Sequence, residues 1–334
     1  MRLLYFVFAL MLSVSGGFLF SQSGLVPLDR HLSTIKYPFE VHLFEFNTQG
    51  QTLTMAYMDV MPDNYNGKNI LLLHGKNFNG AYWRTTIQQL TANGYRVVVP
   101  DQIGFGKSSK PTTYQYSFHQ LASNTKQLLD TLGIQHTVVL GHSMGGMLAT
   151  RFALMYPDMT LKLILENPIG LEDYKTLTTW QSLNDAYSAE LKNTYESYRK
   201  YQLTFYYDNK WKPEYDEWLN MLAGWTLHPD YPVIARTAAL TTDMIMTQPV
   251  VYEFGDIKVP TLLIIGTRDR TAIGKDRAPK HVQPNMGLYN KLGRKTQRLI
   301  PESKLVELKG VGHMPHIETF DLFITSVLNF LNEK

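Results

Sequence analysis

The stretch VVLGHSMGGML, residues 138–148, places a serine between glycines where an apolar run ends. Ser143 forms the pattern G-x-S-x-G with Gly141 and Gly145. Two interpretations are open: a crowded turn that tolerates only small neighbours, or a nucleophile held out on that turn. An apolar strand pattern precedes the serine and helical spacing follows it in GGMLATRFALMY, which is the strand–turn–helix context of a nucleophilic serine beside a helix N-terminus. The context favours the nucleophile.

A serine hydroxyl is a weak nucleophile without a base, and His313 is the best candidate among the ten histidines. It lies in GVGHMPHIE, just past the last apolar run, where glycines allow the loop to turn back over a sheet. His316 is the local competitor, but we expect it to begin the final helix in an exposed or capping role. His142 adjoins the serine on the same turn and is expected to point elsewhere.

The base needs a carboxylate to orient it, and Asp269 follows the apolar run LLIIGTR. Asp276, seven residues further along, is the second choice, and Asp256 precedes the run at its wrong end. The order Ser143, Asp269, His313 along the chain is the order typical of a parallel-sheet hydrolase.

Acyl transfer also needs donors for the negatively charged oxygen of the intermediate. The backbone N–H of Met144, the residue after the serine, is one candidate. The second candidate is the backbone N–H of Lys76, in the loop after LLLHG. Two roles are open for the Lys76 side chain, contact with an anionic substrate group or simple solvation, and we expect solvation.

The elements that must position these residues alternate along the chain. FEVHLFEF and LTMAYMDV flank a short turn and predict an antiparallel hairpin. Short apolar runs then alternate with stretches of helical spacing, which predicts βαβ units and an α/β fold with a mostly parallel sheet covered by helices on both faces. The expected strands lie in residues 69–75, 95–101, 136–143, 161–168, 260–269 and 303–313. Four of these strands end next to Lys76, Ser143, Asp269 and His313, so we expect these four residues to meet at one edge of the sheet.

Residues 169–250 interrupt the alternation with aromatic side chains at spacings of three and four, as in Tyr195, Tyr198 and Tyr201. Such stripes indicate helices. Core packing of an inserted helical subdomain is the simpler explanation, and a cap whose aromatics line a substrate pocket is the functional one. We expect an inserted helical cap at 169–250 and a core formed by 24–168 and 251–334.

At this point the sequence resembles the α/β-hydrolase superfamily. The segments HGKNFNG, DQIGFGKS, GHSMGG, GTRDRT and GVGHMPHIE stand in the family's order, and the resemblance covers nearly everything from Phe39 onward except the cap region. It implies an α/β-hydrolase fold with a cap inserted after the sixth strand, and a structural role for Asp101 and Gly104. Because the nucleophile position holds serine rather than aspartate, it disfavours haloalkane dehalogenase and epoxide hydrolase chemistry.

Composition excludes several other functions. The chain has 334 residues, a net charge of +3, no dense basic run and no cysteine, and it contains no CxxC or HExxH spacing. We therefore expect no nucleic-acid partner, no metal and no cofactor. One arginine precedes an apolar run from Leu3 to Phe20, so residues 1–23 are predicted to be an export signal peptide; an uncleaved membrane anchor is the alternative.

Together these features predict an exported, periplasmic or secreted serine hydrolase that cleaves a carboxylic ester of an apolar acyl group. The same triad acting on a carbon–carbon bond or an N-terminal peptide bond is the alternative, and a non-catalytic binding protein ranks below both. An aminopeptidase needs a cluster of carboxylates to hold the substrate amine. The available ones are Glu166, Glu172, Asp173, Glu214, Asp216 and Glu217.

Overall fold

The computed structural model describes residues 25–333. Its centre is one eight-stranded sheet with the strand order β1-β2-β4-β3-β5-β6-β7-β8. The strands are β1 (His42–Thr48), β2 (Gln51–Val60), β3 (Asn69–Leu73), β4 (Arg96–Pro100), β5 (Thr137–His142), β6 (Thr160–Glu166), β7 (Thr261–Gly266) and β8 (Ser303–Leu308). The hairpin β1–β2 is antiparallel and β2 pairs antiparallel with β4, whereas all pairs from β4 to β8 are parallel. The predicted α/β class is confirmed.

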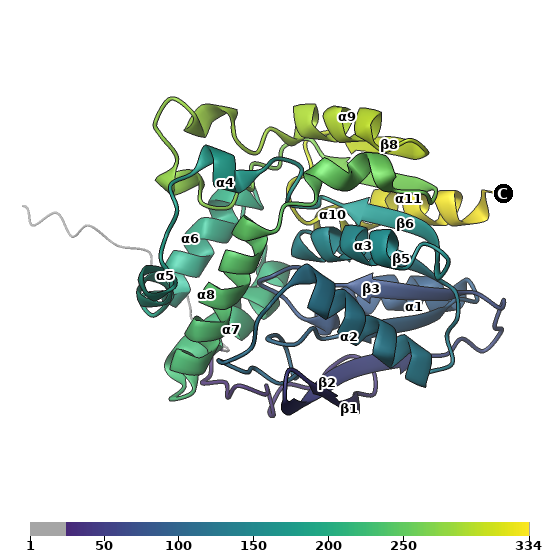
Figure 1. Ribbon diagram of the computed structural model, residues 1–334, viewed down its shortest axis with the longest axis horizontal. Coiled ribbons are helices and arrows are strands. Elements are labelled where there is room, and N and C mark those ends of the chain that lie inside the picture. The colour runs from purple at the N-terminus through teal and green to yellow at the C-terminus, as the bar shows by residue number, and fades with distance from the viewer. Residues whose placement is uncertain (1–24, 334) are drawn as a thin grey trace, which may run out of the picture.

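Helices cover both faces of this sheet (Figure 1). They are α1 (Arg84–Ala92), α2 (Phe118–Thr131), α3 (Met144–Met155), α4 (Tyr174–Leu177), α5 (Leu183–Glu190), α6 (Tyr195–Phe205), α7 (Asp216–Gly224), α8 (Tyr231–Thr247), α9 (Tyr289–Leu299), α10 (Pro315–Glu318) and α11 (Phe320–Asn332). The sheet is buried on both sides because successive side chains of a strand point to opposite faces. In β3, Leu71 and Leu73 join the core under α2 and α3, while Ile70 and Leu72 join the core under α1 and α11.

The helices α4 to α8 lie between β6 and β7 and gather at one side of the sheet, on the left in Figure 1. We call residues 169–250 the insertion. Its helices have their own start signals: Thr194 and Ser197 form a capping box at the start of α6. The insertion therefore consists of helices, and the sheet continues across it from β6 to β7.

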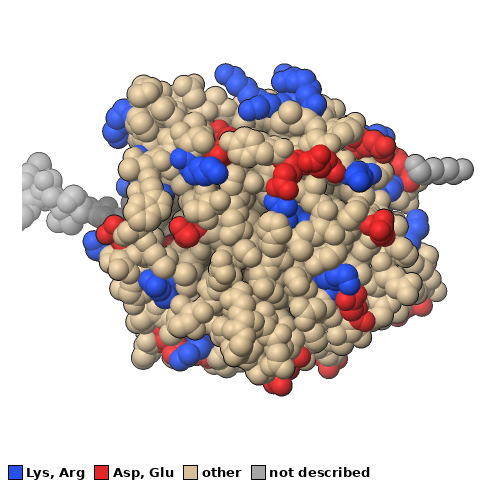
Figure 2. All heavy atoms as spheres, in the orientation of Figure 1, with Lys and Arg blue, Asp and Glu red and all other residues tan. Residues whose placement is uncertain are grey.

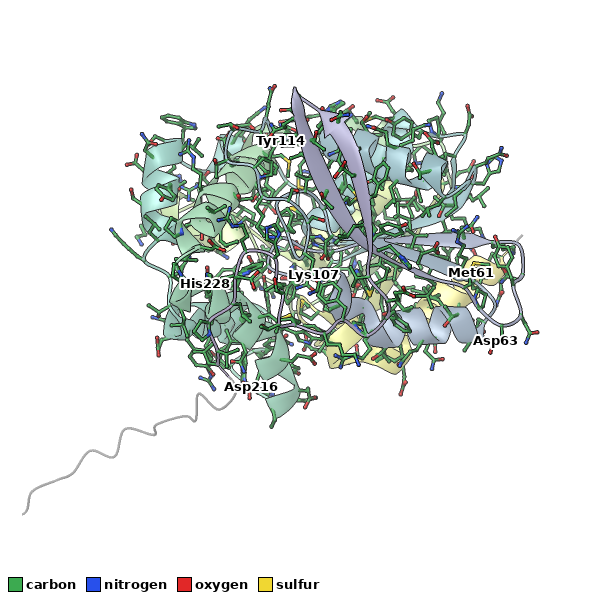
Figure 3. The ribbon with its side chains drawn as sticks, turned by 90° about the horizontal axis from the view of Figure 1, so that it is seen from below. Met61, Asp63, Lys107, Tyr114, Asp216 and His228 are labelled. Atoms are coloured by element: carbon green, nitrogen blue, oxygen red, sulfur yellow. The ribbon has the colours of Figure 1, made fainter. Side chains whose placement is uncertain are left out.

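The segment before β1 joins the insertion to the core. Arg30 pairs with Asp230 at 3.0 Å, close to His228, which Figure 3 labels in the insertion. Two residues further on, the Leu32 carbonyl accepts a hydrogen bond of 2.6 Å from Lys107 in the loop after β4, also labelled in Figure 3. This segment therefore fastens α8 to the loop that follows β4.

Charged side chains of both signs are interspersed over the face shown in Figure 2. Within residues 25–333, no helix has the length and apolar character needed to cross a bilayer. The predicted signal peptide or anchor at 1–23 lies outside the described residues and stays a prediction.

Candidate active site

Ser143 occupies a strained turn between β5 and α3. Its φ is +56° and its ψ is −119°, a left-handed conformation that non-glycine residues rarely adopt. A Cβ at Gly141 would collide with the Gly145 carbonyl, and a Cβ at Gly145 would collide with the Leu73 carbonyl of the neighbouring strand. Both glycines are therefore required for the close approach of β5, α3 and β3 that holds the serine in place.

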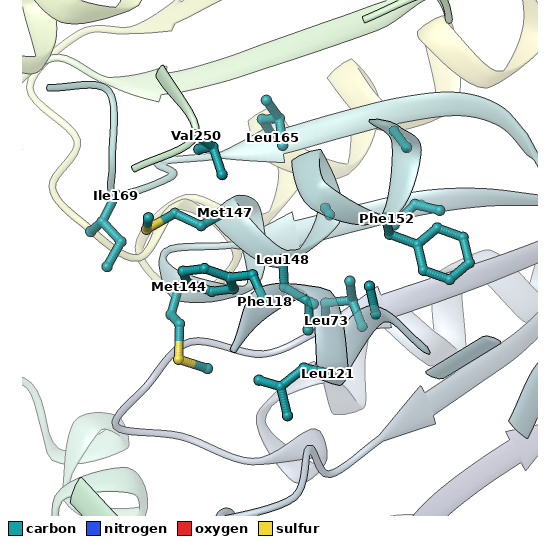
Figure 4. Close-up of a cluster of buried hydrophobic side chains, with 14 of the residues drawn as sticks. Leu73, Phe118, Leu121, Met144, Met147, Leu148, Phe152, Leu165, Ile169 and Val250 are labelled. Carbon is teal, nitrogen blue, oxygen red and sulfur yellow. The ribbon is translucent and has the colours of Figure 1, made fainter. Parts of the chain in front are cut away.

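The helix after the serine is anchored in the larger core. Figure 4 shows Met144, Met147 and Leu148 of α3 packed among side chains from other elements. Those that the figure labels are Leu73, Phe118, Leu121, Leu165, Ile169 and Val250, and the labelled Phe152 lies further along α3 itself. This packing offsets the strain at the turn and fixes the helix N-terminus beside the serine hydroxyl.

The structure brings Ser143, His313 and Asp269 together. The Ser143 hydroxyl donates to Nε2 of His313 at 3.0 Å, and Nδ1 of His313 donates to Oδ2 of Asp269 at 2.6 Å. Asp269 and His313 are fully buried, and Ser143 is 6% exposed. The loops after β5, β7 and β8 thus deliver a hydroxyl, a carboxylate and an imidazole in one hydrogen-bonded line, the geometry of a serine nucleophile with its base.

Asp269 is held as a carboxylate. Burial alone raises its pKa, but the charge of His313 and hydrogen bonds from His313, Asn167 and Thr271 outweigh burial, so that the pKa is lowered. Oδ2 accepts from Nδ2 of Asn167 at 2.7 Å, and Oδ1 accepts from the backbone N–H of Thr271 at 2.8 Å. The ionised form can therefore orient His313 and stabilise it when it becomes a cation.

Asn167 is a part of the site that the sequence analysis missed. It follows β6, which lies between β5 and β7, so its side chain lies between the two loops that carry Ser143 and Asp269. Besides Asp269, Nδ2 contacts the Gly312 carbonyl at 3.1 Å, and Oδ1 accepts from the Gly266 N–H at 2.8 Å. The rule that polar residues at carboxyl ends of parallel strands converge applies equally to Asn167 and was the available signal.

The two expected oxyanion donors belong to segments that adjoin Ser143. Met144 is the first residue of α3, and Lys76 follows Gly75, where an added Cβ would lie 3.2 Å from the Ser143 Cβ. Within the described part of the chain, neither the Lys76 N–H nor the Met144 N–H has a hydrogen-bond acceptor. Both groups are thus free to bind an oxygen, and the oxyanion role itself stays a prediction.

The expected solvation of the Lys76 side chain is wrong. Its ammonium lies 3.6 Å from the Glu190 carboxylate at the end of α5, and the two side chains are only 17% and 20% exposed. The expectation failed because the insertion reaches over the loop after β3 and supplies an opposite charge there, a contact between residues far apart in the chain.

A family model described as the alpha/beta hydrolase fold matches residues 68–320. The chain belongs to the α/β-hydrolase family. Its fold also matches a crystal structure of a probable hydrolytic enzyme from Pseudomonas aeruginosa PAO1, with 48% identity, a TM-score of 0.92, and coverage of 94% of this chain and 100% of that chain.

More distant relatives share the fold as well. Lipase 1 of Psychrobacter immobilis is 26% identical over 283 residues, which cover 81% of this chain and 80% of the lipase. The enol-lactonase of Burkholderia xenovorans LB400 has a TM-score of 0.65 at 21% identity, over 87% of this chain and 100% of its own. The likeness to the lipase and the family match together support a hydrolase. The likeness to the enol-lactonase shows the fold alone.

In this α/β hydrolase, His142 connects the backbone of His313 to the Tyr82 side chain through hydrogen bonds. Its Nε2 donates to the His313 carbonyl at 2.8 Å, and its Nδ1 accepts from the Tyr82 hydroxyl at 3.1 Å. That hydroxyl in turn accepts the Gly75 N–H at 2.9 Å. Burial lowers the pKa of His142 to about 3, so the ring is neutral. A neutral imidazole donates from one nitrogen and accepts at the other, which fixes the donor and the acceptor of each hydrogen bond that the ring makes.

The expected exposed or capping role of His316 is wrong. The side chain is buried in α10, and both its backbone N–H and its Nδ1 donate to Oε1 of Glu166 at 2.8 Å. Burial lowers the pKa of His316 to about 3 and raises the pKa of Glu166 to about 7. The chain after His313 turns inward toward the end of β6, a turn that local sequence could not show.

This buried carboxyl predicts a pH-dependent stability. Because the pKa of Glu166 rises from 4.5 to about 7 on folding, the unfolded chain loses the proton first, and the free energy of unfolding falls as pH rises from about 5 to above 7. Glu166→Gln keeps an acceptor for His316 but cannot ionise. In denaturant unfolding from pH 5 to pH 9, the free energy of unfolding of the variant minus that of the wild type should rise by about 3 kcal/mol between the two limits.

The matched control for that measurement is Glu302→Gln, at an exposed glutamate. The same unfolding series on this variant separates the effect of the buried site from the effect of losing one carboxyl elsewhere on the chain. A Glu166→Gln difference that stays constant from pH 5 to pH 9 would show that the buried carboxyl does not titrate between those limits.

A cavity of about 330 Å³ lies between the core and the insertion. Its walls include Lys76 and Phe105 from the core and Tyr201, Trp225 and Ile234 from the insertion. Ser143 is not part of the wall; Lys76 joins the two, because the preceding Gly75 lies against the serine. The cavity thus borders the loop after β3, and the same loop reaches the serine.

The six acidic residues that were available for an aminopeptidase alternative lie elsewhere. None of the six borders this cavity. Glu166 binds His316, Asp216 accepts from Trp211, and Glu217 pairs with Arg84. Across residues 25–333 there is no group of three or more acidic or histidine side chains arranged to hold a metal ion.

Proposed function

We propose that this α/β hydrolase is a serine esterase that cleaves carboxylic esters through a covalent acyl-enzyme. The observation that carries the proposal is the buried hydrogen-bonded line from Ser143 through His313 to Asp269. A lipase relative matching four-fifths of the chain supports an ester substrate. No cofactor is needed for this chemistry.

In the proposed reaction, His313 Nε2 removes the hydroxyl proton of Ser143 as the oxygen attacks the ester carbonyl. Asp269 holds the imidazole through Nδ1 and stabilises the resulting cation. His313 then returns the proton to the leaving alcohol, and the acyl group stays on Ser143. Water, deprotonated by the same imidazole, attacks the acyl-enzyme and releases the acid.

The tetrahedral intermediates carry a negative oxygen, and the proposed donors to it are the backbone N–H groups of Lys76 and Met144. Both lack an acceptor among the described residues, which fits groups kept free for a reacting oxygen. Met144 also opens α3, whose N-terminal dipole favours negative charge at that point.

The insertion acts as a cap in this proposal, and the cavity beneath it accepts the acyl group. Trp225, Leu222 and Ile234 supply apolar wall, and a volume of about 330 Å³ is at the low end for ligand pockets. We infer an apolar acyl group of modest size. Among the described residues that line the wall, Glu190 is the one carboxylate, and it already pairs with Lys76. An ester therefore fits the cavity better than a free amine.

The test is to label the wild type with a fluorophosphonate and to assay p-nitrophenyl esters from acetate to palmitate beside aminoacyl amides. We expect labelling at Ser143 and highest kcat/KM on short to medium esters. Faster turnover of the amides would shift the proposal to a peptidase. No labelling and no turnover would identify a non-catalytic binding protein.

A further inference from the structure

Tyr206, the residue that follows α6, lies directly on the imidazole of His313. The two ring centroids are 4.6 Å apart and the planes differ by 25°, which is a stacked arrangement. The Tyr206 side chain is buried. The insertion thus covers the face of the base with one aromatic ring.

The Tyr206 hydroxyl reaches a second part of the site. It accepts a hydrogen bond of 3.3 Å from Nδ2 of Asn77, the residue after Lys76. Asn77 belongs to the loop after β3 that carries the free Lys76 N–H. One side chain of the insertion therefore contacts the base and the proposed oxyanion loop at the same time.

The Tyr206 backbone is held against the same loops. Its carbonyl accepts a hydrogen bond of 3.2 Å from Nη1 of Arg268, the residue before Asp269. The same carbonyl lies so close to Gly312, the residue before His313, that a Cβ at position 312 would collide with it. Arg268 also pairs with Glu318, which accepts the Gly312 N–H at 2.8 Å. The position of Tyr206 is therefore determined by the segments that carry Asp269 and His313.

We propose that Tyr206 is a positioning residue that aligns His313 and the loop of Lys76 for catalysis, so that the seating of the insertion sets the catalytic geometry. This inference rests on the proposed function. Hydrogen bonds to Asp269 and Ser143 hold two edges of the imidazole but leave it able to tilt about the line between them. A stacked ring limits that tilt, and its electron-rich face favours the cation that forms during attack.

The neighbouring Tyr207 provides a matched control. It lies in the same buried segment but stacks on Tyr215, with centroids 3.7 Å apart and planes 7° apart. Its hydroxyl has no hydrogen-bond partner in the described part of the chain. Replacing Tyr207 removes comparable packing from the insertion without removing a contact to His313 or Asn77.

The experiment compares Tyr206→Leu, Tyr206→Phe and Tyr207→Leu in the full chain. For each, kcat and KM on the best p-nitrophenyl ester, the fluorophosphonate labelling rate and the thermal midpoint are measured. We expect Tyr206→Leu to lower kcat and the labelling rate by about 10- to 100-fold with KM changed by less than about threefold. Tyr206→Phe keeps the stacked ring and should recover most of that loss.

Tyr207→Leu should lower the thermal midpoint about as much as Tyr206→Leu while leaving kcat and the labelling rate close to those of the wild type. Equal kcat and labelling rates in the two leucine variants would overturn the proposal, because Tyr206 would then act through packing alone. A wild type that neither labels nor hydrolyses esters would instead refute the proposed function.

A double-mutant cycle tests the hydroxyl separately and remains decisive if Tyr206→Leu does not fold. Tyr206→Phe and Asn77→Ala should each lower kcat a few-fold, and the double variant should lose no more than either single variant. Strictly additive losses would show that the hydroxyl does not act through Asn77 and would overturn that half of the proposal.

Discussion

Ser143→Ala is expected to lower turnover of the best ester by about 10⁶-fold, by analogy with the loss of the nucleophile in other serine triads. In the proposed reaction this hydroxyl is the group that attacks. The neighbouring His142 cannot replace it, because its two ring nitrogens already bond to the Tyr82 hydroxyl and the His313 carbonyl. Initial rates on p-nitrophenyl esters at high enzyme concentration measure the loss, and fluorophosphonate labelling should disappear with it.

The same variant should fold normally. Alanine keeps the left-handed backbone at 143 with no more strain than serine, and the N–H of residue 143 still donates to the Glu166 carbonyl at 3.2 Å. We therefore expect a thermal midpoint close to that of the wild type. Turnover retained in a folded Ser143→Ala variant would place the nucleophile at another residue and end the serine-esterase proposal.

Asp269→Asn is expected to lower kcat by about 10⁴-fold, as for the equivalent change in another serine triad. Oδ2 accepts hydrogen bonds from both His313 and Asn167, and Oδ1 accepts one from the backbone N–H of Thr271. An amide at 269 that keeps its oxygen on the Thr271 N–H presents its NH₂ to Nδ1 of His313. His313 then carries its proton on Nε2, where it cannot accept one from Ser143.

The matched control is Asp276→Asn, the second carboxylate that the sequence offered. Asp276 lies in the short helix Lys275–Arg277, and its carboxylate makes no hydrogen bond within the described residues. Its replacement should leave kcat within about twofold of the wild type. A larger loss at 276 than at 269, with both variants folded, would show that Asp276 and not Asp269 orients the base.

Most of the fold could be predicted because hydrophobic periodicity is local. The hairpin and the six later strands were confirmed within a few residues, since each is an apolar run closed by glycine, proline or a polar turn. The parallel direction of the strands from β3 onward and their burial on both faces follow from βαβ connections, which apply to any such alternation. The strand order came from the structure.

The proposed triad could be picked out of the sequence for a chemical reason. A serine between two glycines after a strand leaves few structural explanations, and His313 and Asp269 also stand at strand ends. Residues that reach the site only through contacts between distant segments have no such motif in the sequence. Asn167 has no motif, Tyr206 is one of twenty tyrosines, and His316 lies three residues after His313 yet turns toward β6.

The amino-acid sequence by itself determined the strands, the helices and the strained turn at Ser143, because backbone preferences and alternating burial act over a few residues. Only the tertiary structure decided which side chains of the insertion and of β6 meet the site. Tyr206 on His313, Lys76 beside Glu190 and Asn167 on Asp269 are contacts across many residues of chain. They depend on how helices seat on a sheet edge, and that seating minimises exposed area and unpaired buried charge over the whole molecule.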